Sequence, residues 1–502
     1  MSTAAETFLA LQIDARSPVP LRRQLFVELR KALLRGVLPV GTRLPSSRRL
    51  AQRLSLSRTT VVEVFEELIA DGIITGRPGS GTFVASTPRR EQAPPGALQP
   101  PDLSARGNRI MLTAAATART DRLIGAFRSG LPALDAFPNE MWARHLARAA
   151  RQPPIETLDY GDAAGYWPLR AAIAERLAVT RGIRCRADNV LVVAGTQQAM
   201  DFAAQLLVDV DDAVCVEDPG YVPIRSAFLA AGARLVPAPV DDDGLDVSAA
   251  ELRAPRPKII VVAPSHQFPL AVTLSAQRRT ALLSWAERAQ AWIIEDDFES
   301  EFRYDGRSLD ALQSSDTAGR VIYVGTFSKT LFPSLRIGYV VAPTAFVGAF
   351  SALARLSGLS PKLIEQAALA SLIDSGDFSQ HVHRMRRLYA ERQHALIEAV
   401  EKRPGAMLRL APAASGLHLF GRLSPDVSDK SVVALAAAQN IYVEAASALS
   451  LETFCNGLIL GYAVTPPDEI RNGIDILARV IERVAHDAAA EREVCCSLKV
   501  SP

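Results

Sequence analysis

The residue with the most specific chemistry is Lys329, which follows the apolar run 320–325 and the segment Thr326-Phe327-Ser328. The chain has seven lysines, and arginine supplies the rest of its 56 basic residues. Arginine cannot lose its proton in a protein, whereas a partly buried lysine can, and a Schiff base requires a neutral amine. A single lysine after a strand is more often a surface residue, so its neighbours decide how it is interpreted.

Polar residues also follow four other apolar runs of the sequence. They are Gly195-Thr196-Gln197-Gln198, Asp218-Pro219-Gly220-Tyr221, Ser265-His266-Gln267 and Asp296-Asp297-Phe298. Such groups suit an anionic heteroaromatic ligand, and the turn at Gly195 opens a predicted helix whose first N–H groups can hold a phosphate. Taken alone, Asp296 is equally well explained as an acid at a helix N-cap, and Tyr221 as a core aromatic.

Short β-branched runs alternate with alanine- and leucine-rich helical segments from about residue 110 onward. The predicted strands are 189–194, 213–217, 258–263, 291–295, 320–325 and 336–341. Near-continuous apolar strands with helices between them predict an α/β fold, with a mostly parallel sheet covered on both faces. Ligands of such sheets bind at the carboxyl ends of the strands, where the polar residues lie.

The first 86 residues have a different pattern. Leu21, Leu25, Leu29 and Leu33 recur every four residues, as on an amphipathic helix. Two further helices are predicted over 44–54, capped by Ser46, and over 58–70, with Val61, Phe65, Leu68 and Ile69 on the apolar side; a glycine-rich hairpin follows over 73–84. Three short helices and a hairpin form a winged helix-turn-helix.

Charge separates the two parts of the chain. Residues 1–90 contain fourteen Arg and Lys against seven Asp and Glu, a balance of +7, so the remainder carries −5 of the net +2. A basic small domain on an acidic large one suggests that only the first meets a polyanion. We therefore predict a DNA-binding domain at 1–86, a proline-rich linker at 87–109, a large domain at 110–488 that ends in a small α+β subdomain, and a flexible tail at 489–502.

Composition excludes several classes of protein. The chain is 48% hydrophobic and 22% charged, without an apolar run long enough for a membrane span or a basic-then-apolar secretory signal. The five cysteines show neither metal-ligand spacing nor an even disulfide framework. We expect a cytoplasmic protein with reduced thiols, no membrane partner and no metal site.

The N-terminal segment resembles the GntR family of bacterial regulators. The resemblance covers about residues 17–85 and rests on GTRLPSSRRLAQRLSLSRTTVVEVFEELIADGIITGRPGSGTFV. It implies that an operator in double-stranded DNA is contacted by Arg48, Arg58, Thr59, Thr60 and, in the wing, Gly79. Arginine can pair bidentately with guanine, a contact that contributes roughly 1–3 kcal/mol of discrimination. The family often has a further arginine at the position of Val62, so one contact is missing.

Nearly the whole chain resembles the MocR family, in which a GntR-type domain is fused to a fold-type-I aminotransferase domain. The matching segments are YGDAAGYWPLR (160–170), VLVVAGTQQAMDF (190–202), VEDPGY (216–221), APSHQFP (263–269), IIEDDFESEFRY (293–304) and YVGTFSKTLFPSLRIGYVV (323–341). The resemblance implies that pyridoxal 5′-phosphate (PLP) forms a Schiff base with Lys329 and that Asp296 faces its pyridine nitrogen.

The other implied cofactor contacts follow from the same segments. Thr326, Ser328, Arg336, Thr196 and Gln197 would hold the phosphate. Tyr221 would lie over the ring, and His266 or Gln267 would approach its 3-oxygen. Tyr160 would reach the phosphate of a second subunit, which implies a homodimer.

Three departures from the family pattern bear on function. Phe298 replaces a tyrosine whose hydroxyl would contribute on the order of 1 kcal/mol, and Pro269-Leu270-Ala271 replaces Pro-Thr-Gly. Ile459 replaces an arginine that clamps the substrate carboxylate, a charge-assisted bond of roughly 1.5–3 kcal/mol. Arg225 could substitute for that arginine, although a surface salt bridge is its more ordinary role.

These observations favour a DNA-binding regulator over an enzyme. Its effector would be PLP itself, as in the PdxR-like subgroup that controls vitamin B6 synthesis, or an amino acid or amine that reacts with PLP. Two alternatives stay open: an active aminotransferase that carries a DNA-binding segment, and a regulator whose large domain is only a dimerisation scaffold.

Overall fold

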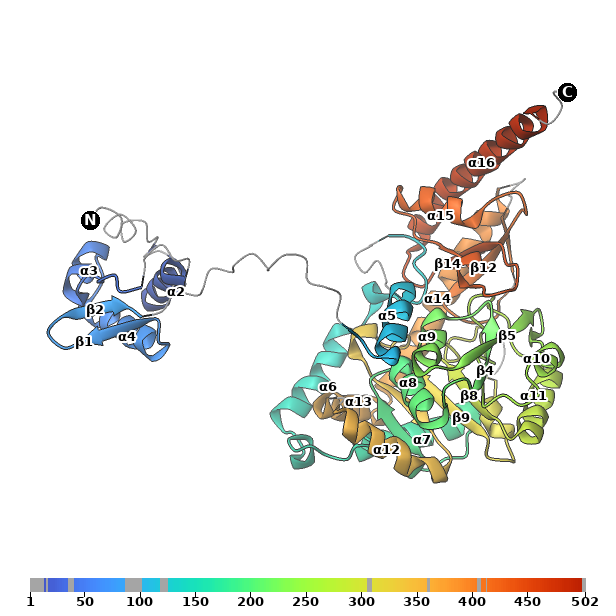
Figure 1. Ribbon diagram of the computed structural model, residues 1–502, viewed down its shortest axis with the longest axis horizontal. Helices are drawn as coiled ribbons and strands as arrows, with labels where there is room; N and C mark the ends of the chain where they lie inside the picture. The colour runs from blue at the N-terminus through green and yellow to red at the C-terminus, as the bar shows by residue number, and fades with distance from the viewer. Residues whose placement is uncertain are drawn as a thin grey trace. The chain divides into compact units, whose positions relative to one another are not determined.

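The structure, a computed structural model, describes residues 13–14, 17–34, 40–85, 102–117, 125–304, 309–358, 362–403, 408–411 and 413–498. The chain divides into two compact units, residues 1–102 and 103–502 (Figure 1). Within the described residues, no helix combines the length and hydropathy needed to cross a lipid bilayer.

The small unit consists of helices and a hairpin around a leucine-rich core. Its elements are α2 (Leu21–Leu34), α3 (Ser47–Leu54), α4 (Arg58–Ala70), β1 (Ile74–Arg77) and β2 (Gly81–Val84). Most of the predicted apolar positions are buried, among them Leu25, Leu29 and Phe65. Leu21 and Ile69 are exposed, contrary to expectation. Leu21 is the first residue of α2, and the buried stripe of α4 is complete without Ile69.

Serine caps fix the starts of α3 and α4. The Ser46 hydroxyl accepts from the Arg49 amide at 3.3 Å, as predicted. The Ser57 hydroxyl accepts from the Thr60 amide at 3.0 Å and lies 2.7 Å from the Thr60 hydroxyl. A side-chain oxygen at this position satisfies an amide that the helix itself leaves unpaired.

The large unit is built on an eight-stranded sheet with the order β3-β10-β9-β8-β7-β4-β5-β6. Its strands are β3 (Val190–Val193), β4 (Ala213–Asp218), β5 (Arg234–Asp241), β6 (Gly244–Leu245), β7 (Ile259–Val262), β8 (Trp292–Asp297), β9 (Val321–Thr326) and β10 (Gly338–Val341). The pairs β4–β5, β4–β7, β7–β8 and β8–β9 are parallel, whereas β10 is antiparallel to both of its neighbours and β6 to β5. The predicted mostly parallel sheet is confirmed, and β5 and β6 extend it beyond the six predicted strands.

Helices cover both faces of this sheet, as the apolar strands predict. On β7, Ile259 and Val261 pack into one hydrophobic cluster, which includes Phe228 of α9 (Val222–Ala231). Ile260 and Val262 pack into another, which includes Trp285 of α11 (Ala276–Ala289).

The other helices of this part are α5 (Ala105–Thr117), α6 (Asn139–Arg151), α7 (Trp167–Arg181), α8 (Thr196–Leu207), α10 (Val247–Arg253), α12 (Thr344–Ser357) and α13 (Leu363–Asp374). Short 3-10 turns are η1 (Leu134–Ala136), η2 (Ile155–Thr157), η3 (Ala187–Asn189), η4 (Leu312–Ser315), η5 (Pro333–Leu335) and η6 (Ala446–Leu449).

A smaller antiparallel sheet forms the predicted α+β subdomain. Its order is β11-β12-β14-β13, with β11 (Leu408–Leu410), β12 (His418–Leu423), β13 (Glu444–Ala445) and β14 (Gly457–Gly461). The helices α14 (Asp377–Glu401), α15 (Asp429–Ala437) and α16 (Pro467–Leu498) accompany it.

Two segments differ from the sequence prediction. Of the predicted linker at 87–109, residues 87–101 lie outside the described residues, and α5 already begins at Ala105, where Arg109 Nε donates to the Ala230 carbonyl at 3.4 Å. α16 extends to Leu498, so the predicted tail at 489–502 includes helical residues; its flexibility stays a prediction, and residues 499–502 lie outside the described residues.

Candidate cofactor site

A cavity of about 820 Å³ opens at the carboxyl ends of the parallel strands. The loops after β4, β7, β8 and β9 line it on one side, and residues of the small subdomain line it on the other. It contains eight of the ten residues predicted to contact a cofactor: Thr196, Gln197, Tyr221, Asp296, Thr326, Ser328, Lys329 and Arg336. The carboxyl ends of the parallel strands therefore border a concave site, where the sequence predicts ligand binding.

Lys329 lies in the tight segment that follows β9. The Ser328 amide donates to Thr326 Oγ1 at 3.1 Å, which turns the chain at the strand end. The Lys329 ammonium donates to the carbonyl of Gly130, a residue that also lines the cavity. The amine is therefore held at the cavity wall, on the side where β8 ends.

Asp296 supplies a buried carboxyl group opposite Lys329. It is 6% exposed, and within the described part of the chain its Oδ1 has no hydrogen-bond partner. Burial and, to a smaller extent, the nearby Asp297 raise its pKa to about 7 against the opposing effect of Lys329. A buried acid with an unused oxygen is suited to pair with a cationic N–H group from a ligand, such as a protonated pyridine nitrogen.

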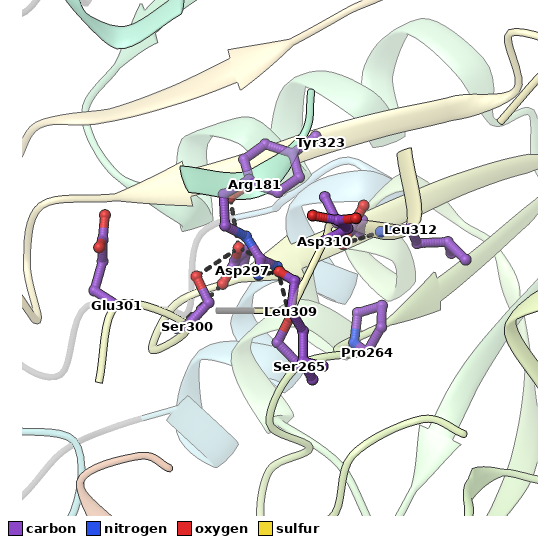
Figure 2. A network of polar contacts seen from close by, with 12 residues as sticks. Arg181, Pro264, Ser265, Asp297, Ser300, Glu301, Leu309, Asp310, Leu312 and Tyr323 are labelled. Carbon is purple, nitrogen blue, oxygen red and sulfur yellow. Dashed lines mark hydrogen bonds and ion pairs between the residues drawn. The ribbon is translucent and has the colours of Figure 1, made fainter. Parts of the chain in front are cut away.

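The neighbouring Asp297 is not available for such a role. Figure 2 shows it inside a network that the sequence did not predict, with Arg181 Nη2 at 2.9 Å from Asp297 Oδ2. The Tyr323 hydroxyl donates to the same carboxylate at 2.5 Å and the Ser300 hydroxyl at 2.8 Å. Arg181 also donates to Ser265 Oγ at 2.7 Å. This network distinguishes the two adjacent acids and leaves only Asp296 for the cavity.

A second corner of the cavity has the character of a phosphate site. Gly195 caps the N-terminus of α8 with φ +100°, which favours glycine. A Cβ atom there would lie 3.4 Å from the guanidinium carbon of Arg336, so the cation lies against the helix start. The hydroxyl groups of Thr326 and Ser328 border the same cavity. A helix N-terminus, a guanidinium and two hydroxyls together bind phosphate well.

Of the remaining predicted contacts, Tyr221 lines the cavity, with its ring centroid 5.7 Å from that of Phe268. His266 is buried outside the cavity lining, and Gln267 donates to the carbonyls of Pro219 (2.8 Å) and Phe268 (2.7 Å). Tyr160 is 96% exposed and lies apart from the cavity of its own chain. The cofactor roles of all these residues, those of His266 and Tyr160 included, stay predictions.

Ile459 is completely buried in the small subdomain, with Phe420 and Ala446 in the same apolar cluster. Arg225 is also buried, so its interpretation as a surface salt bridge is wrong. It donates to the carbonyls of Leu449 (2.7 Å) and Glu217 (2.8 Å) and pairs with Asp218 at 3.4 Å. These contacts engage most of the guanidinium, although Arg225 also lines the cavity.

Asp218 joins the end of β4 to the small subdomain. Its carboxylate accepts from the amides of Leu451 (2.6 Å), Glu452 (2.8 Å) and Thr453 (2.7 Å). Although burial opposes it, these hydrogen bonds hold the Asp218 pKa below its usual value. Because these hydrogen bonds join residues more than 230 positions apart, no local sequence pattern could have predicted them.

The predicted DNA contacts lie on the surface of the small unit. Arg58 and Thr59 are exposed in the first turn of α4, and Arg48 is exposed on α3. Gly79 is exposed in the turn between β1 and β2, with φ +72°. Thr60 is half-buried, and its hydroxyl engages Ser57.

Comparisons with known proteins match both units. Residues 21–84 match the gntR family of bacterial regulatory proteins, and residues 136–477 match aminotransferase class I and II. The chain is 40% identical over 477 residues to the probable rhizopine catabolism regulatory protein MocR of Rhizobium meliloti, covering 93% of this chain and 95% of that protein. It is 30% identical to the pyridoxine biosynthesis regulator PdxR of Corynebacterium glutamicum, covering 92% and 96%.

Solved aminotransferase structures resemble the large unit. The α-aminoadipate aminotransferase LysN of Thermus thermophilus has a TM-score of 0.67 at 27% identity, covering 75% of this chain and 95% of that one. The kynurenine aminotransferase of Pyrococcus horikoshii has a TM-score of 0.67 at 26% identity, covering 76% and 95%.

The raised pKa of Asp296 predicts a pH dependence of stability in the PLP-free chain. An acid whose folded pKa exceeds its unfolded value stabilises the fold below about pH 4, and this contribution is lost as the pH rises towards about 7. Asp296→Asn should therefore lose less stability over that range, and it retains the dependence due to other buried acids with raised pKa values, such as Glu217 and Glu299. Urea midpoints followed by tryptophan fluorescence measure this, because all four tryptophans lie in the large unit.

The surface substitution Asp188→Asn serves as the control and should follow the unmodified chain. Parallel pH profiles for Asp296→Asn and the unmodified chain would show that Asp296 does not take up a proton in the fold.

Proposed function

The chain belongs to the MocR family of GntR-type transcription regulators, and from this we propose that PLP bound at Lys329, alone or as an adduct, controls how it binds DNA. Residues 1–86 would bind the operator, and residues 110–488 would hold the effector. As a DNA-binding regulator, the protein would act in the cytoplasm.

One observation carries the PLP proposal. A buried carboxyl group with an unused oxygen lines the same cavity as the lysine amine and the groups that are suited to bind phosphate. Asp296, Lys329 and Arg336 come from three different segments, yet all three line the cavity. A protonated pyridine nitrogen would compensate the buried charge of Asp296, and a phosphate would do so for Arg336. The donor set therefore fits PLP.

When bound, PLP supplies an aldehyde and an electron-withdrawing ring that react with primary amines. The chain itself binds and orients it. The amine of Lys329 would bind PLP at its aldehyde carbon, and the carboxylate of Asp296 would keep a proton on the pyridine nitrogen. Arg336, Thr326, Ser328 and the start of α8 would fix the phosphate, while Tyr221 would cover one side of the ring. Because the pKa of Asp296 is near 7, its carboxyl group can be either protonated or negatively charged at neutral pH.

The missing carboxylate clamp favours a regulator over an aminotransferase. Ile459 is an apolar core residue, and Arg225 is held by backbone carbonyls and Asp218. An α-amino acid would therefore lack the bidentate partner that positions it for proton transfer. We infer that any transamination is slow.

Two effectors are compatible with this site. PLP alone agrees with the 30% identity to PdxR, named for pyridoxine biosynthesis. An adduct of PLP with an amine or amino acid has separate support, since the 40% identical MocR is named for rhizopine catabolism. We favour PLP alone as the effector, because it requires no further side chains to bind a second ligand.

A homodimer would connect effector and DNA. Tyr160 is flanked by the exposed apolar side chains Ile155, Leu158 and Trp167, which suit a contact with a second copy. Two winged units on a symmetric dimer would read paired half-sites roughly 34 Å apart, or a multiple of that distance. An effector that favours one arrangement would change affinity, footprint or DNA bending.

Lys329→Ala should abolish the response of DNA binding to PLP. We expect PLP to change the operator affinity of the unmodified chain by about 5- to 150-fold. Fluorescence anisotropy with a DNA fragment selected from a random pool measures the affinity, and visible absorbance reports bound PLP. Lys362→Ala, on an exposed lysine paired with Glu365, is the matched control. Equal affinity, footprint and bending with and without PLP in the unmodified chain would contradict the proposal.

Arg58→Ala should weaken operator binding while leaving PLP binding unchanged. The arginine begins α4, where the helix N-terminus faces anions, and a lost base contact costs roughly 1–3 kcal/mol, or about 5- to 150-fold in affinity. Arg22→Ala removes the same charge from α2, where it pairs with Glu67 near the other end of α4. If both variants lose affinity equally, general charge rather than a specific contact explains the loss.

A further inference from the structure

Three buried side chains from distant parts of the sequence meet beside the cofactor cavity. His266 follows β7, Glu299 follows β8 and His418 begins β12. They are 2%, 2% and 1% exposed. We propose that these three residues bind a divalent transition-metal ion of the zinc class, a site that the sequence did not predict.

The ligand atoms already lie near coordination geometry. His266 Nε2 is 3.5 Å from Glu299 Oε2, and His418 Nδ1 is 3.8 Å from the same oxygen. One ligand atom from each residue lies within 4.8 Å of the others. Zinc binds imidazole nitrogen and carboxylate oxygen at about 2.0–2.2 Å, so tetrahedral ligands stand roughly 3.3 Å apart. A small inward shift of the two rings completes the site.

The chemistry of the donors matches such an ion. Two imidazoles and one carboxylate form a ligand set used by zinc, whereas Ca²⁺ and Mg²⁺ prefer oxygen ligands alone. Metal ligation requires neutral histidine, and both imidazoles are almost completely buried, which disfavours their charged form. The Glu299 carboxyl group is buried as deeply, and a charged carboxylate in such a place needs a positive partner.

Neighbouring groups hold two of the three residues, His266 and Glu299, as they would hold metal ligands. Ser415 Oγ lies 3.3 Å from His266 Nδ1, which fixes the ring and leaves Nε2 directed at the cluster. Within the described part of the chain, that Nε2 atom has no hydrogen-bond partner. The Leu417 amide donates to Glu299 Oε2 at 2.9 Å. A metal-binding histidine usually has its other nitrogen paired in this way, and ligating carboxylates are likewise hydrogen-bonded.

The backbone leaves space for the His266 ring. Gly416 has φ +95°, and a Cβ atom at this position would overlap that ring. Glycine is required there on both counts.

Three protein ligands leave one coordination position open. Glu299 and His418 both line the cavity that contains Lys329 and Asp296, so a fourth ligand can come from that side. Water would occupy it in the absence of an effector, and an oxygen or nitrogen atom of an effector could replace the water. The metal would also add positive charge directly beside the buried Glu299 carboxylate.

Titration of the full-length chain with Co²⁺ after chelation and removal of PLP tests the proposal. PLP binds divalent ions through its own oxygen atoms, so the Lys329→Ala chain is titrated in parallel. We expect one Co²⁺ per chain with the strong visible absorption of tetrahedral cobalt, displaced by Zn²⁺. His418→Ala and Glu299→Gln should weaken the affinity by at least about ten-fold, whereas His383→Ala, on an exposed histidine, should not.

A folded, unmodified chain that shows no such absorption would overturn the proposal, as would binding that both variants leave unchanged. If the two variants fail to fold, X-ray absorption spectroscopy of the Zn²⁺-loaded unmodified chain identifies the atoms that bind the metal. Two imidazole nitrogens and one carboxylate oxygen support the site, and any other protein ligand set contradicts it.

Discussion

The burial of two adjacent carboxyl groups at the end of β8 is the constraint on which the site depends. Like charges in a poorly solvated interior destabilise each other, so each needs its own partner. Arg181, Tyr323 and Ser300 compensate Asp297, which leaves Asp296 as the acid that faces the cavity. In the parallel register, Asp296 lies opposite Val324 on β9, and Lys329 follows five residues later. The adjacent strands thus bring acid and amine to one wall.

The cavity is shared between the large sheet and the small subdomain, and this limits how a ligand can act. Asp218 ties the backbone at 451–453 to the end of β4, and Arg225 ties Leu449 to the same strand. Residues on both sides of this link line the cavity. A ligand that fills it therefore contacts both parts at once, which is the physical condition for a bound molecule to alter their relative position.

Sequence reasoning found what is encoded locally. Strands with continuous apolar runs, the capped helices near Ser46 and the polar residues at strand ends follow from patterns of ten residues or fewer, and the structure contains them. It did not find Arg181 opposite Asp297, the Asp218 link or the cluster at His266, because those contacts join residues more than 30 positions apart. The burial of Arg225 depends in part on the contact with Leu449, which lies 224 positions away and leaves no local signal. The exposure of Leu21 and Ile69 has a different cause, because periodicity predicts where an apolar stripe lies on a helix but not where the stripe ends.

The double contact between Ser57 and Thr60 has a consequence for the kinetics of the proposed DNA recognition. One hydroxyl holds both the amide and the side chain of Thr60, so the first turn of α4 has its final conformation before any operator arrives. A reading surface that is preorganised in this way loses little conformational entropy on docking. If α4 reads DNA as proposed, discrimination between operator sequences would depend on how long the complex survives, because the first turn of the helix would need no further ordering.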